Sequence, residues 1–315
     1  MSLQVLLPLD GSPFSEQALP FAGALALRSN AVLHLVQVHR TTKTFDAHSV
    51  ASVTVEWERR VSEREYLGRL AEWLRDEYGC AVRSSVLHGG IVTSLENYIR
   101  DENIGLVVMT SHGQSGVRRE WLGSSADGLV RSSTVPVFLL RPQVKGAGLR
   151  TPTQLGKILI PLDGSALAEQ IIEPALALGG TAGTRYRLVQ VVPPERALSV
   201  STSPDEGRFS RAESKLRPLS ATEYLERIAE GLRARGYAVD TTVITHWNAP
   251  AAILDLSRNG SADMIAMATR GRGGWQRIAF GSVTDRVQRN TSLPMLLVQP
   301  VDQNQNAPFA EAVGD

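Results

Sequence analysis

An internal repeat constrains the fold of this chain more than any other sequence feature. Residues 7–12 (LPLDGS) return as residues 160–165 (IPLDGS), and residues 35–38 (LVQV) return unchanged as residues 188–191, both at an offset of 153. Later matches, including Gly123-Ser124 with Gly281-Ser282, are offset by 158, so the second copy carries five extra residues before that point. A chain of 315 residues is about twice a common domain size, which predicts two similar domains.

Each copy alternates between apolar strand patterns and amphipathic helix patterns. In the first copy, strands are predicted at residues 4–9, 32–38, 82–87, 106–109 and 137–140, and helices at residues 15–27, 58–78, 93–103 and 124–132. Strands that alternate with helices at this spacing predict a parallel sheet covered on both faces. The predicted fold class is therefore α/β, with two tandem doubly wound parallel-sheet domains.

The domains are predicted at residues 1–142 and 157–300. Residues 143–156 read as a linker, and the polar tail at 301–315 is predicted to be disordered. Residues 40–56 and 193–221 lack a clean period and follow the second strand of their copy. They are interpreted as variable surface loops, or alternatively as a lid or clasp at the carboxyl edge of the sheet.

Composition excludes several classes of protein. The first 150 residues carry 16 Lys and Arg against 15 Asp and Glu, and the remainder 17 against 17, so no bulk field favours nucleic acid or a membrane surface. A single cysteine, Cys80, makes no internal disulfide and is expected to be a small buried residue ahead of a strand. With no apparent leader or membrane span, the chain is expected to be cytoplasmic. No metal site is predicted.

A glycine-rich turn follows a buried strand in both copies. Nine residues separate Gly113 from Gly123-Ser124, and nine separate Gly271 from Gly281-Ser282. Glycine after a strand permits close backbone approach, and the helix start offers free amides and the positive end of the dipole, so the pattern favours a phosphate cradle. The alternative is an ordinary strand–loop–helix turn in which Ser124 and Ser282 are N-caps.

These turns, together with the aspartates that follow the first strand of each copy, resemble the nucleotide-binding members of the universal stress protein family. The resemblance implies a tandem protein with Rossmann-like domains that bind ATP, or another adenine nucleotide, with Mg²⁺. It implies that Asp10 and Asp163 hold the ribose hydroxyls. The residues implied to flank the adenine or hold the phosphates are Pro8, Val38, Met109, Gly113, Gly123, Ser124 and Ser125 in the first copy, and Pro161, Val191, Met267, Gly271, Gly281, Ser282 and Val283 in the second.

Both copies depart from the family pattern at its first glycine, which is Thr110 in one and Ala268 in the other. The smaller alanine makes the second site the safer expectation, because a β-branched residue demands more room. Charged loop residues at positions 112, 118, 119, 270, 272 and 277 are candidate phosphate contacts or solvated charges. His88 and His246 end the third strand of each copy without an accompanying acid or nucleophile, so no catalytic residue is assigned.

The sequence is consistent with three functions. The first is a regulatory protein of the stress response whose nucleotide state alters domain packing or partner choice. The second is a slow ATPase or phosphotransferase in the same pocket, with Asp127 and Asp285 as matched acids that otherwise only favour a helix first turn. The third is a nucleotide-free interaction module. The resemblance also implies that the last strands, 137–140 and 295–298, pair within the chain as an internal pseudo-dimer, which would cover their edges. A homodimer and an unknown protein partner are possible additions.

Overall fold

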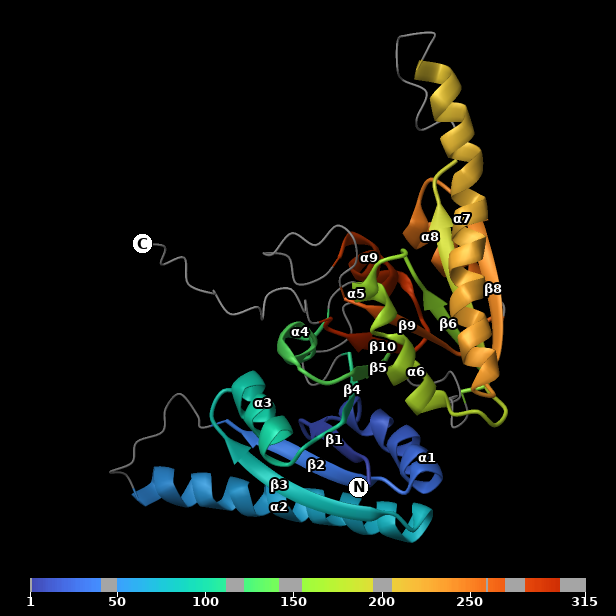
Figure 1. Ribbon diagram of the computed structural model, residues 1–315. Helices are drawn as coiled ribbons and strands as arrows, with labels where there is room; N and C mark the ends of the chain where they lie inside the picture. Colours follow the sequence, from blue (N-terminus) through green and yellow to red (C-terminus); the bar gives the residue numbers. More distant parts are fainter. Residues whose placement is uncertain are drawn as a thin grey trace, which may run out of the picture.

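The computed structural model describes residues 2–40, 50–111, 122–141, 155–194, 206–258, 260–269 and 281–300. Strands and helices alternate in both halves (Figure 1). The first half contains β1 (Gln4–Leu9), the 3-10 helix η1 (Ser15–Ala18), α1 (Leu19–Ser29), β2 (Val32–His39), α2 (Val50–Tyr78), β3 (Ala81–His88), α3 (Ile91–Asp101), β4 (Leu106–Thr110), α4 (Ser124–Ser132) and β5 (Val137–Leu140). The second contains β6 (Lys157–Pro161), α5 (Ala166–Glu169), α6 (Ile172–Gly179), β7 (Arg185–Val192), α7 (Glu206–Ala234), β8 (Ala238–Thr245), α8 (Ala249–Ser257), β9 (Met264–Ala268), α9 (Ser282–Asn290) and β10 (Met295–Val298).

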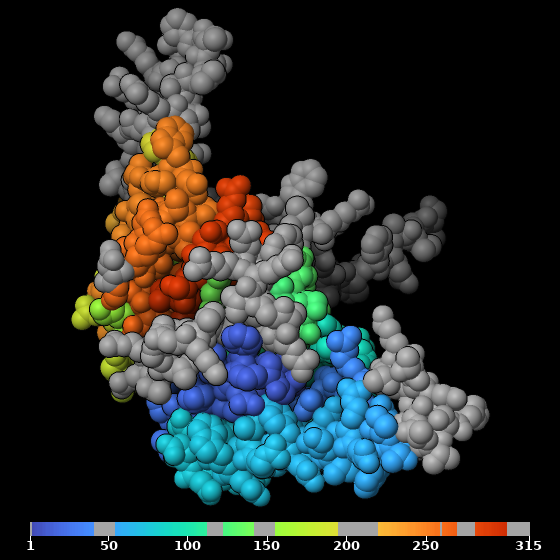
Figure 2. All heavy atoms as spheres, turned by 180° about the vertical axis from the view of Figure 1, so that it is seen from behind, coloured from blue at the N-terminus to red at the C-terminus, as the bar shows by residue number. Residues whose placement is uncertain are grey.

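The ten strands form one continuous sheet in the order β3-β2-β1-β4-β5-β10-β9-β6-β7-β8. Neighbouring strands are parallel within each half, which confirms the α/β class. The two halves join where β5 and β10 pair antiparallel, with Phe138 opposite Leu296. The last strand of each half therefore finds its partner inside the chain, as the sequence predicts. Figure 2 shows the halves from behind, the first in blue and cyan and the second in orange and red.

Two apolar layers hold the helices against the sheet. One layer packs α1 and α2 of the first half and α6 and α7 of the second against one face, and the other packs α3, α4, α8 and α9 against the opposite face. Both layers run through the central strands from one half into the other. At the centre of the first layer, Phe21 of α1 stacks on Phe138 of β5 with ring centroids 4.2 Å apart. The halves therefore share a hydrophobic core as well as a strand pair.

Two sequence-based boundaries are wrong. Residues 40–56 are predicted as loop, yet α2 begins at Val50, because here the usual burial pattern is inverted. Val55 and Trp57 are 54% and 64% exposed, while Glu56 between them is buried. In the second half, residues 193–221 are predicted as loop, yet α7 begins at Glu206 and continues through Pro218. Any lid or clasp is therefore restricted to residues 41–49 and 195–205, which lie outside the described residues.

The strand order changes direction at one central strand in each half. In the first half β1 lies between β2 and β4, so the crossovers on its two sides leave in opposite directions. Loops at the carboxyl ends of the strands separate at such a point, and doubly wound sheets bind their ligands there. In the second half, β6 lies between β7 and β9 in the same way. Cys80 is buried directly before β3, as expected.

Candidate functional site

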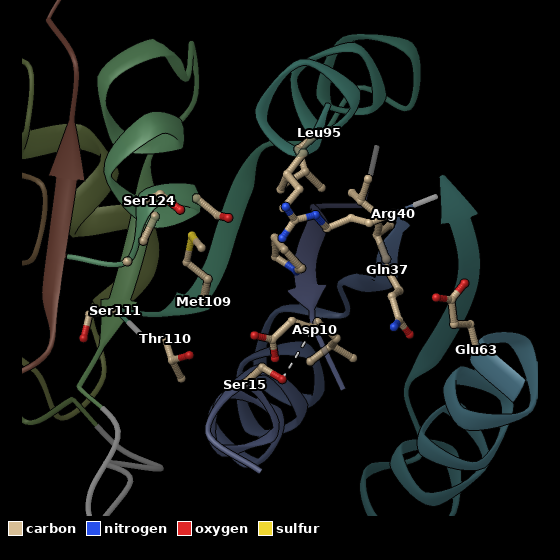
Figure 3. A pocket seen from close by; sticks show the side chains of 18 of the residues that line it. Asp10, Ser15, Gln37, Arg40, Glu63, Leu95, Met109, Thr110, Ser111 and Ser124 are labelled. Carbon is tan, nitrogen blue, oxygen red and sulfur yellow. Dashed lines mark hydrogen bonds between the residues drawn. The ribbon is translucent and has the colours of Figure 1, made fainter. Parts of the chain in front are cut away.

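A cavity of about 300 Å³ opens at the carboxyl ends of β1, β2 and β4 in the first half. Figure 3 shows the side chains that line it, contributed by these strands and by α2, α3 and α4. The cavity brings together nearly all the site residues predicted for this half, namely Pro8, Asp10, Val38, Met109, Gly123, Ser124 and Ser125. Gly113 lies outside the described residues. Pro8 and Ser125, which are 117 positions apart in the chain, therefore meet at one place.

The Asp-Gly-Ser motif forms the same tight turn in both halves. Asp10 Oδ1 accepts hydrogen bonds from the amide and hydroxyl of Ser12 at 3.0 and 2.6 Å. Asp163 Oδ1 accepts from the amide and hydroxyl of Ser165 at the same two distances. The glycine between them has a left-handed φ, +78° at Gly11, which explains why glycine is needed there. The turn fixes one carboxylate oxygen and so orients the whole aspartate.

A tyrosine from the long helix braces this turn in each half. The Tyr66 hydroxyl of α2 donates to Glu16 at 3.1 Å, and the Tyr224 hydroxyl of α7 donates to Glu169 at 2.9 Å. Burial, reinforced by the neighbouring glutamate, raises the pKa of both phenols well above the usual range. They therefore stay neutral donors. In the sequence, Glu16-Gln17 recurs as Glu169-Gln170, and residues 65–67 (EYL) recur as residues 223–225. The structure shows that these two matches are the two sides of one contact.

The helices that follow the glycine-rich loops begin with glycine N-caps. Gly123 and Gly281 occupy the N-cap positions of α4 and α9, and neither helix has a side-chain hydrogen bond at its N-cap. By contrast, Ser165 and Asn248 cap α5 and α8 through their side chains. The alternative in which serine side chains cap these turns is therefore wrong. A helix start without a side-chain cap presents backbone amides and the positive dipole end, which suits an anion.

Each glycine-rich loop is closed at its base in the same way. The amide of Gly123 donates to the carbonyl of Ser111 at 2.8 Å, and the amide of Gly281 donates to the carbonyl of Thr269 at 2.5 Å. The loop interiors, including Gly113, Gly271 and the charged residues at positions 112, 118, 119, 270, 272 and 277, lie outside the described residues. The described ends nevertheless fix where each loop leaves the sheet and where it returns.

The second half places its predicted residues at equivalent positions. Pro161 ends β6, Asp163 follows in the turn, and Val191 and Met267 lie near the ends of β7 and β9. Gly281, Ser282 and Val283 form the start of α9. Thr110 and Ala268, at the first glycine of the family pattern, are the last residues of β4 and β9, and both are buried. Thr110 also lines the first cavity.

The cavity also includes polar residues that the sequence analysis did not single out. Gln37 and Arg40 from the β2 end, Arg59 and Glu63 from α2, and Ser15 from η1 all line it. In Figure 3 Arg40 extends across the cavity toward Leu95. For Gln37 a signal was available, because the LVQV segment is identical in both copies and glutamine is its one polar residue. Arg59 and Glu63 gave no such signal, because charged residues on a long helix usually face solvent.

One wall of the first cavity is held by a buried charged cluster. His39 is buried, and its two ring nitrogens contact Glu56, through Nε2, and Glu63, through Nδ1 at 2.8 Å. An imidazole with both protons donates to both carboxylates, whereas the neutral ring donates to one. The His39 hydrogen bond is the main reason that the pKa of Glu56 lies below its usual value. At the same register position β7 carries Val192, so the second half lacks this histidine.

Of two residue pairs that match in the sequence, one is equivalent in the structure and the other is not. His88 ends β3 and packs edge-to-face on His39, but its register counterpart in β8 is Thr245, and His246 follows the strand. The two histidines are therefore not equivalent. Asp127 and Asp285 do correspond, and each forms an ion pair with an arginine four residues later, Arg131 at 2.7 Å and Arg289 at 2.9 Å. These contacts fit charges in a helix first turn.

Among the described residues, no three His, Cys, Asp or Glu side chains are grouped so as to hold a metal ion. None of the helices in the described part of the chain combines the length and apolar character needed to cross a bilayer.

Comparison with known proteins places the fold and the repeat in one family. The Universal stress protein family matches residues 1–141 and again 155–299. A universal stress protein of Mycobacterium tuberculosis is 24% identical over 318 residues, covering 95% of both chains. One from Synechocystis is 27% identical over 156 residues, covering 46% of this chain and 97% of its own. The crystal structure of a universal stress protein from Archaeoglobus fulgidus has a TM-score of 0.67, with 20% identity and coverage of 95% and 97%. With two matches that together span most of its length, the chain belongs to the universal stress protein family.

Proposed function

We propose that this protein is a cytoplasmic regulatory protein that binds an adenine nucleotide, ATP above all, at the carboxyl edge of each half. The observation that carries the proposal is the cavity between β1 and β4, in which an apolar slot, an oriented aspartate and the start of α4 lie together. These three features match the three parts of a nucleotide, which are the base, the sugar and the phosphates. The proposed role is to change domain packing or partner choice with nucleotide state.

The residues present fit each part of the ligand. Val36, Val38, Leu95 and Met109 supply an apolar surface for the base, and Asp10 is oriented by its turn toward the cavity edge where a sugar would follow. Gly123, Ser124 and Ser125 begin α4, where phosphate oxygens would accept hydrogen bonds from backbone amides. Mg²⁺, where present, would arrive on the phosphates, and it would offset their charge.

The two sites are proposed to differ in character. Arg40, Glu63 and the His39 cluster give the first site charged groups. At the matching positions of the second half the chain has Pro193, Ala221 and Val192. Charged residues in the wall form hydrogen bonds with polar groups of the ligand, whereas apolar residues exclude water from the ligand. We therefore propose that the two sites bind the same class of ligand with different affinities.

Binding is proposed as the function in preference to turnover. The matched acids at the start of α4 and α9, Asp127 and Asp285, are engaged with arginines on their own helices. A carboxylate held in this way is less suited to positioning an attacking water than one directed at the ligand. Product analysis with purified protein and Mg-ATP tests this part of the proposal, because sustained release of ADP would contradict it.

The central experiment replaces each glycine N-cap with aspartate. The φ and ψ of Gly123 and Gly281 are −59°, 146° and −62°, 147°, which aspartate adopts readily, and aspartate is a preferred N-cap. Gly123→Asp and Gly281→Asp should therefore leave the melting temperature nearly unchanged while their carboxylates repel phosphate. Equilibrium dialysis with Mg-ATP should give two nucleotides per wild-type chain, one for each single variant and none for the double variant.

The control adds the same charge away from both cavities. Gly231 is exposed on α7 with open space around it, so Gly231→Asp should bind as wild type does. A wild-type protein that binds no nucleotide would refute the proposal and favour the nucleotide-free interaction module. Aspartate variants that bind as much ATP as wild type would refute the assignment of phosphate to the helix starts.

A further inference from the structure

Two glutamines at equivalent positions leave a buried carbonyl oxygen without a hydrogen bond. In the described part of the chain, the buried side-chain polar atoms that lack a partner are Gln37 Oε1, Arg60 Nε, Gln190 Oε1 and Thr269 Oγ1. Gln37 and Gln190 stand at the same place in β2 and β7, one residue before Val38 and Val191. A buried acceptor without a donor is unfavourable, and each such atom in a folded protein calls for an explanation.

The position of Gln37 relates this oxygen to the cavity. Gln37 pairs in register with Leu9 of β1, directly before Asp10, and its side chain lines the cavity. The amide nitrogen of Gln37 would lie 3.9 Å from a Cβ at Gly11, so the side chain reaches the Asp-Gly-Ser turn. In Figure 3 Gln37 and Asp10 belong to the same side of the cavity, with Met109 and Ser124 opposite. In the second half, Leu162, before Asp163, donates to the carbonyl of Val189, next to Gln190, at 2.7 Å.

The chemistry of this wall indicates what it would bind. Asp10 offers a carboxylate and Gln37 an amide carbonyl at the adjacent ends of β1 and β2, so two acceptors lie together here, while Arg40 and Arg59 line the cavity with donors. The cavity also has an apolar lining from Val36, Leu95 and Met109, and it includes the start of α4. Two adjacent acceptors pair with a ligand part that carries two adjacent donors. In a nucleotide that part is the sugar, with two adjacent hydroxyl groups.

We propose that Gln37 and Gln190 are specificity-determining residues that each accept a hydrogen bond from a ribose hydroxyl of the bound nucleotide. This inference rests on the nucleotide binding proposed above. Asp10 and Asp163 orient the sugar through the turn, and the glutamine beside each supplies the second acceptor. A ribonucleotide satisfies the buried carbonyl, whereas a nucleotide without that hydroxyl leaves it unpaired, so the protein distinguishes ribose from deoxyribose.

A purely structural glutamine would behave differently from a ligand-binding one. Removal of a side chain that stabilises the free protein lowers its melting temperature. Here the free protein already carries an unpartnered carbonyl, so Gln37→Leu and Gln190→Leu should leave the melting temperature of the nucleotide-free protein unchanged or raise it. The same variants should lose part of the stabilisation that ATP adds to wild type. An unchanged or higher melting temperature without ATP, together with less stabilisation by ATP, distinguishes a ligand-binding glutamine from a structural one.

The test uses protein with one working site at a time. In the Gly281→Asp background, Gln37→Leu should weaken ATP binding about tenfold, the amount expected for one hydrogen bond to a buried acceptor. Either 2′-deoxy-ATP or 3′-deoxy-ATP, whichever lacks the partner hydroxyl, should bind equally to the variant and its parent. Gln190→Leu in the Gly123→Asp background should show the same pattern. Gln37→Glu keeps an acceptor at the same place and should still favour ATP over that deoxy analogue.

Other results would refute the glutamine contact, the sugar assignment or the proposed function itself. If the parent proteins bind ATP but the leucine variants bind it equally well, the glutamines are not ligand contacts and this inference is wrong. If the variants lose the same affinity for ATP and for both deoxy analogues, the sugar assignment is wrong. It is also wrong if the variants lose affinity for ATP but not for inosine triphosphate, which lacks the 6-amino group. Failure of the wild-type chain to bind any nucleotide would refute the proposed function itself, and is seen before any glutamine is changed.

Discussion

The backbone amide of Gly123 donates to the carbonyl of Ser111 at 2.8 Å, and this contact joins the end of β4 to the start of α4. The carbonyl of Gly123 then accepts from the amide of Asp127 at 2.9 Å, the first hydrogen bond of the helix. One residue therefore closes the glycine-rich loop and begins the helix. The corresponding residues of the second half, Gly281, Thr269 and Asp285, repeat both contacts.

This closure can be removed without forcing the backbone into a strained conformation. Proline fixes φ near −65°, close to the −59° of Gly123, but has no amide hydrogen. Gly123→Pro should therefore lose the hydrogen bond to Ser111 and about 1 kcal/mol of stability, measured by urea unfolding. Gly123→Ala keeps the amide and is the control. Equal unfolding midpoints for the two variants would show that the contact contributes nothing.

The His39–Glu56 contact should make the stability of the first half depend on His39, which has no counterpart in the second half. His39→Val introduces the side chain found at Val192 and leaves Glu56 buried without its partner, so the urea midpoint should fall clearly. Adding Glu56→Leu removes the unpaired carboxylate and should restore much of the loss. A single variant as stable as wild type would mean that Glu56 finds water or another donor when His39 is absent.

The same contact predicts a dependence of stability on pH. The His39 hydrogen bond, with the charges of His39, Arg59 and Arg60, holds the pKa of Glu56 below its usual value. The folded state thus binds this proton less tightly than the unfolded chain does. Its contribution is fully present above the ordinary carboxyl pKa of about 4.3, and is lost as the pH falls through the lower pKa of the folded state. Between pH 6 and pH 4, the urea unfolding midpoint should fall further for wild type than for Glu56→Gln. An equal fall in the two proteins would contradict this account.

The braces beside the two aspartate turns should contribute similarly in both halves. Tyr66→Phe and Tyr224→Phe each remove one hydroxyl that donates to a glutamate, at 3.1 and 2.9 Å. Each variant should lose about 1 kcal/mol, because the ring remains packed and only the hydrogen bond is lost. If nucleotide binding is oriented by these turns, ATP affinity should fall with them. Unchanged stability and affinity in both variants would show that the turns need no brace.

The central strand pair should make the two halves unfold together. Phe138 of β5 is fully buried, stacks on Phe21 and lies opposite Leu296 of β10. Phe138→Ala should cost about 3 kcal/mol through lost burial and the cavity that remains. Calorimetry should show a single unfolding transition for wild type, and a single transition at a lower temperature for Phe138→Ala. Two well-separated wild-type transitions would indicate that the shared core couples the halves only weakly.

The sequence by itself determined the repeat and the alternation of strands and helices, and through the family resemblance it named most of the candidate residues that line the first cavity. Runs such as residues 4–9 predict buried strands because both faces of a parallel sheet are covered. The family resemblance pointed to Pro8, Asp10, Val38 and Met109, and the cavity collects them because parallel strands bring their carboxyl ends to one edge. These inferences succeed because periodicity and turn chemistry are local properties of a chain.

Only the tertiary structure decided which polar groups find partners. Residues 50–57 gave no helical pattern because Glu56 turns inward to His39, seventeen residues away, while Val55 and Trp57 turn outward. The glycine N-cap of α4, the different counterparts of His88 and His246, and the unpartnered carbonyl of Gln37 likewise depend on neighbours distant in sequence. A side chain's own identity sets what it can donate or accept, but the packing of distant elements decides whether that capacity is met by the protein or left for a ligand.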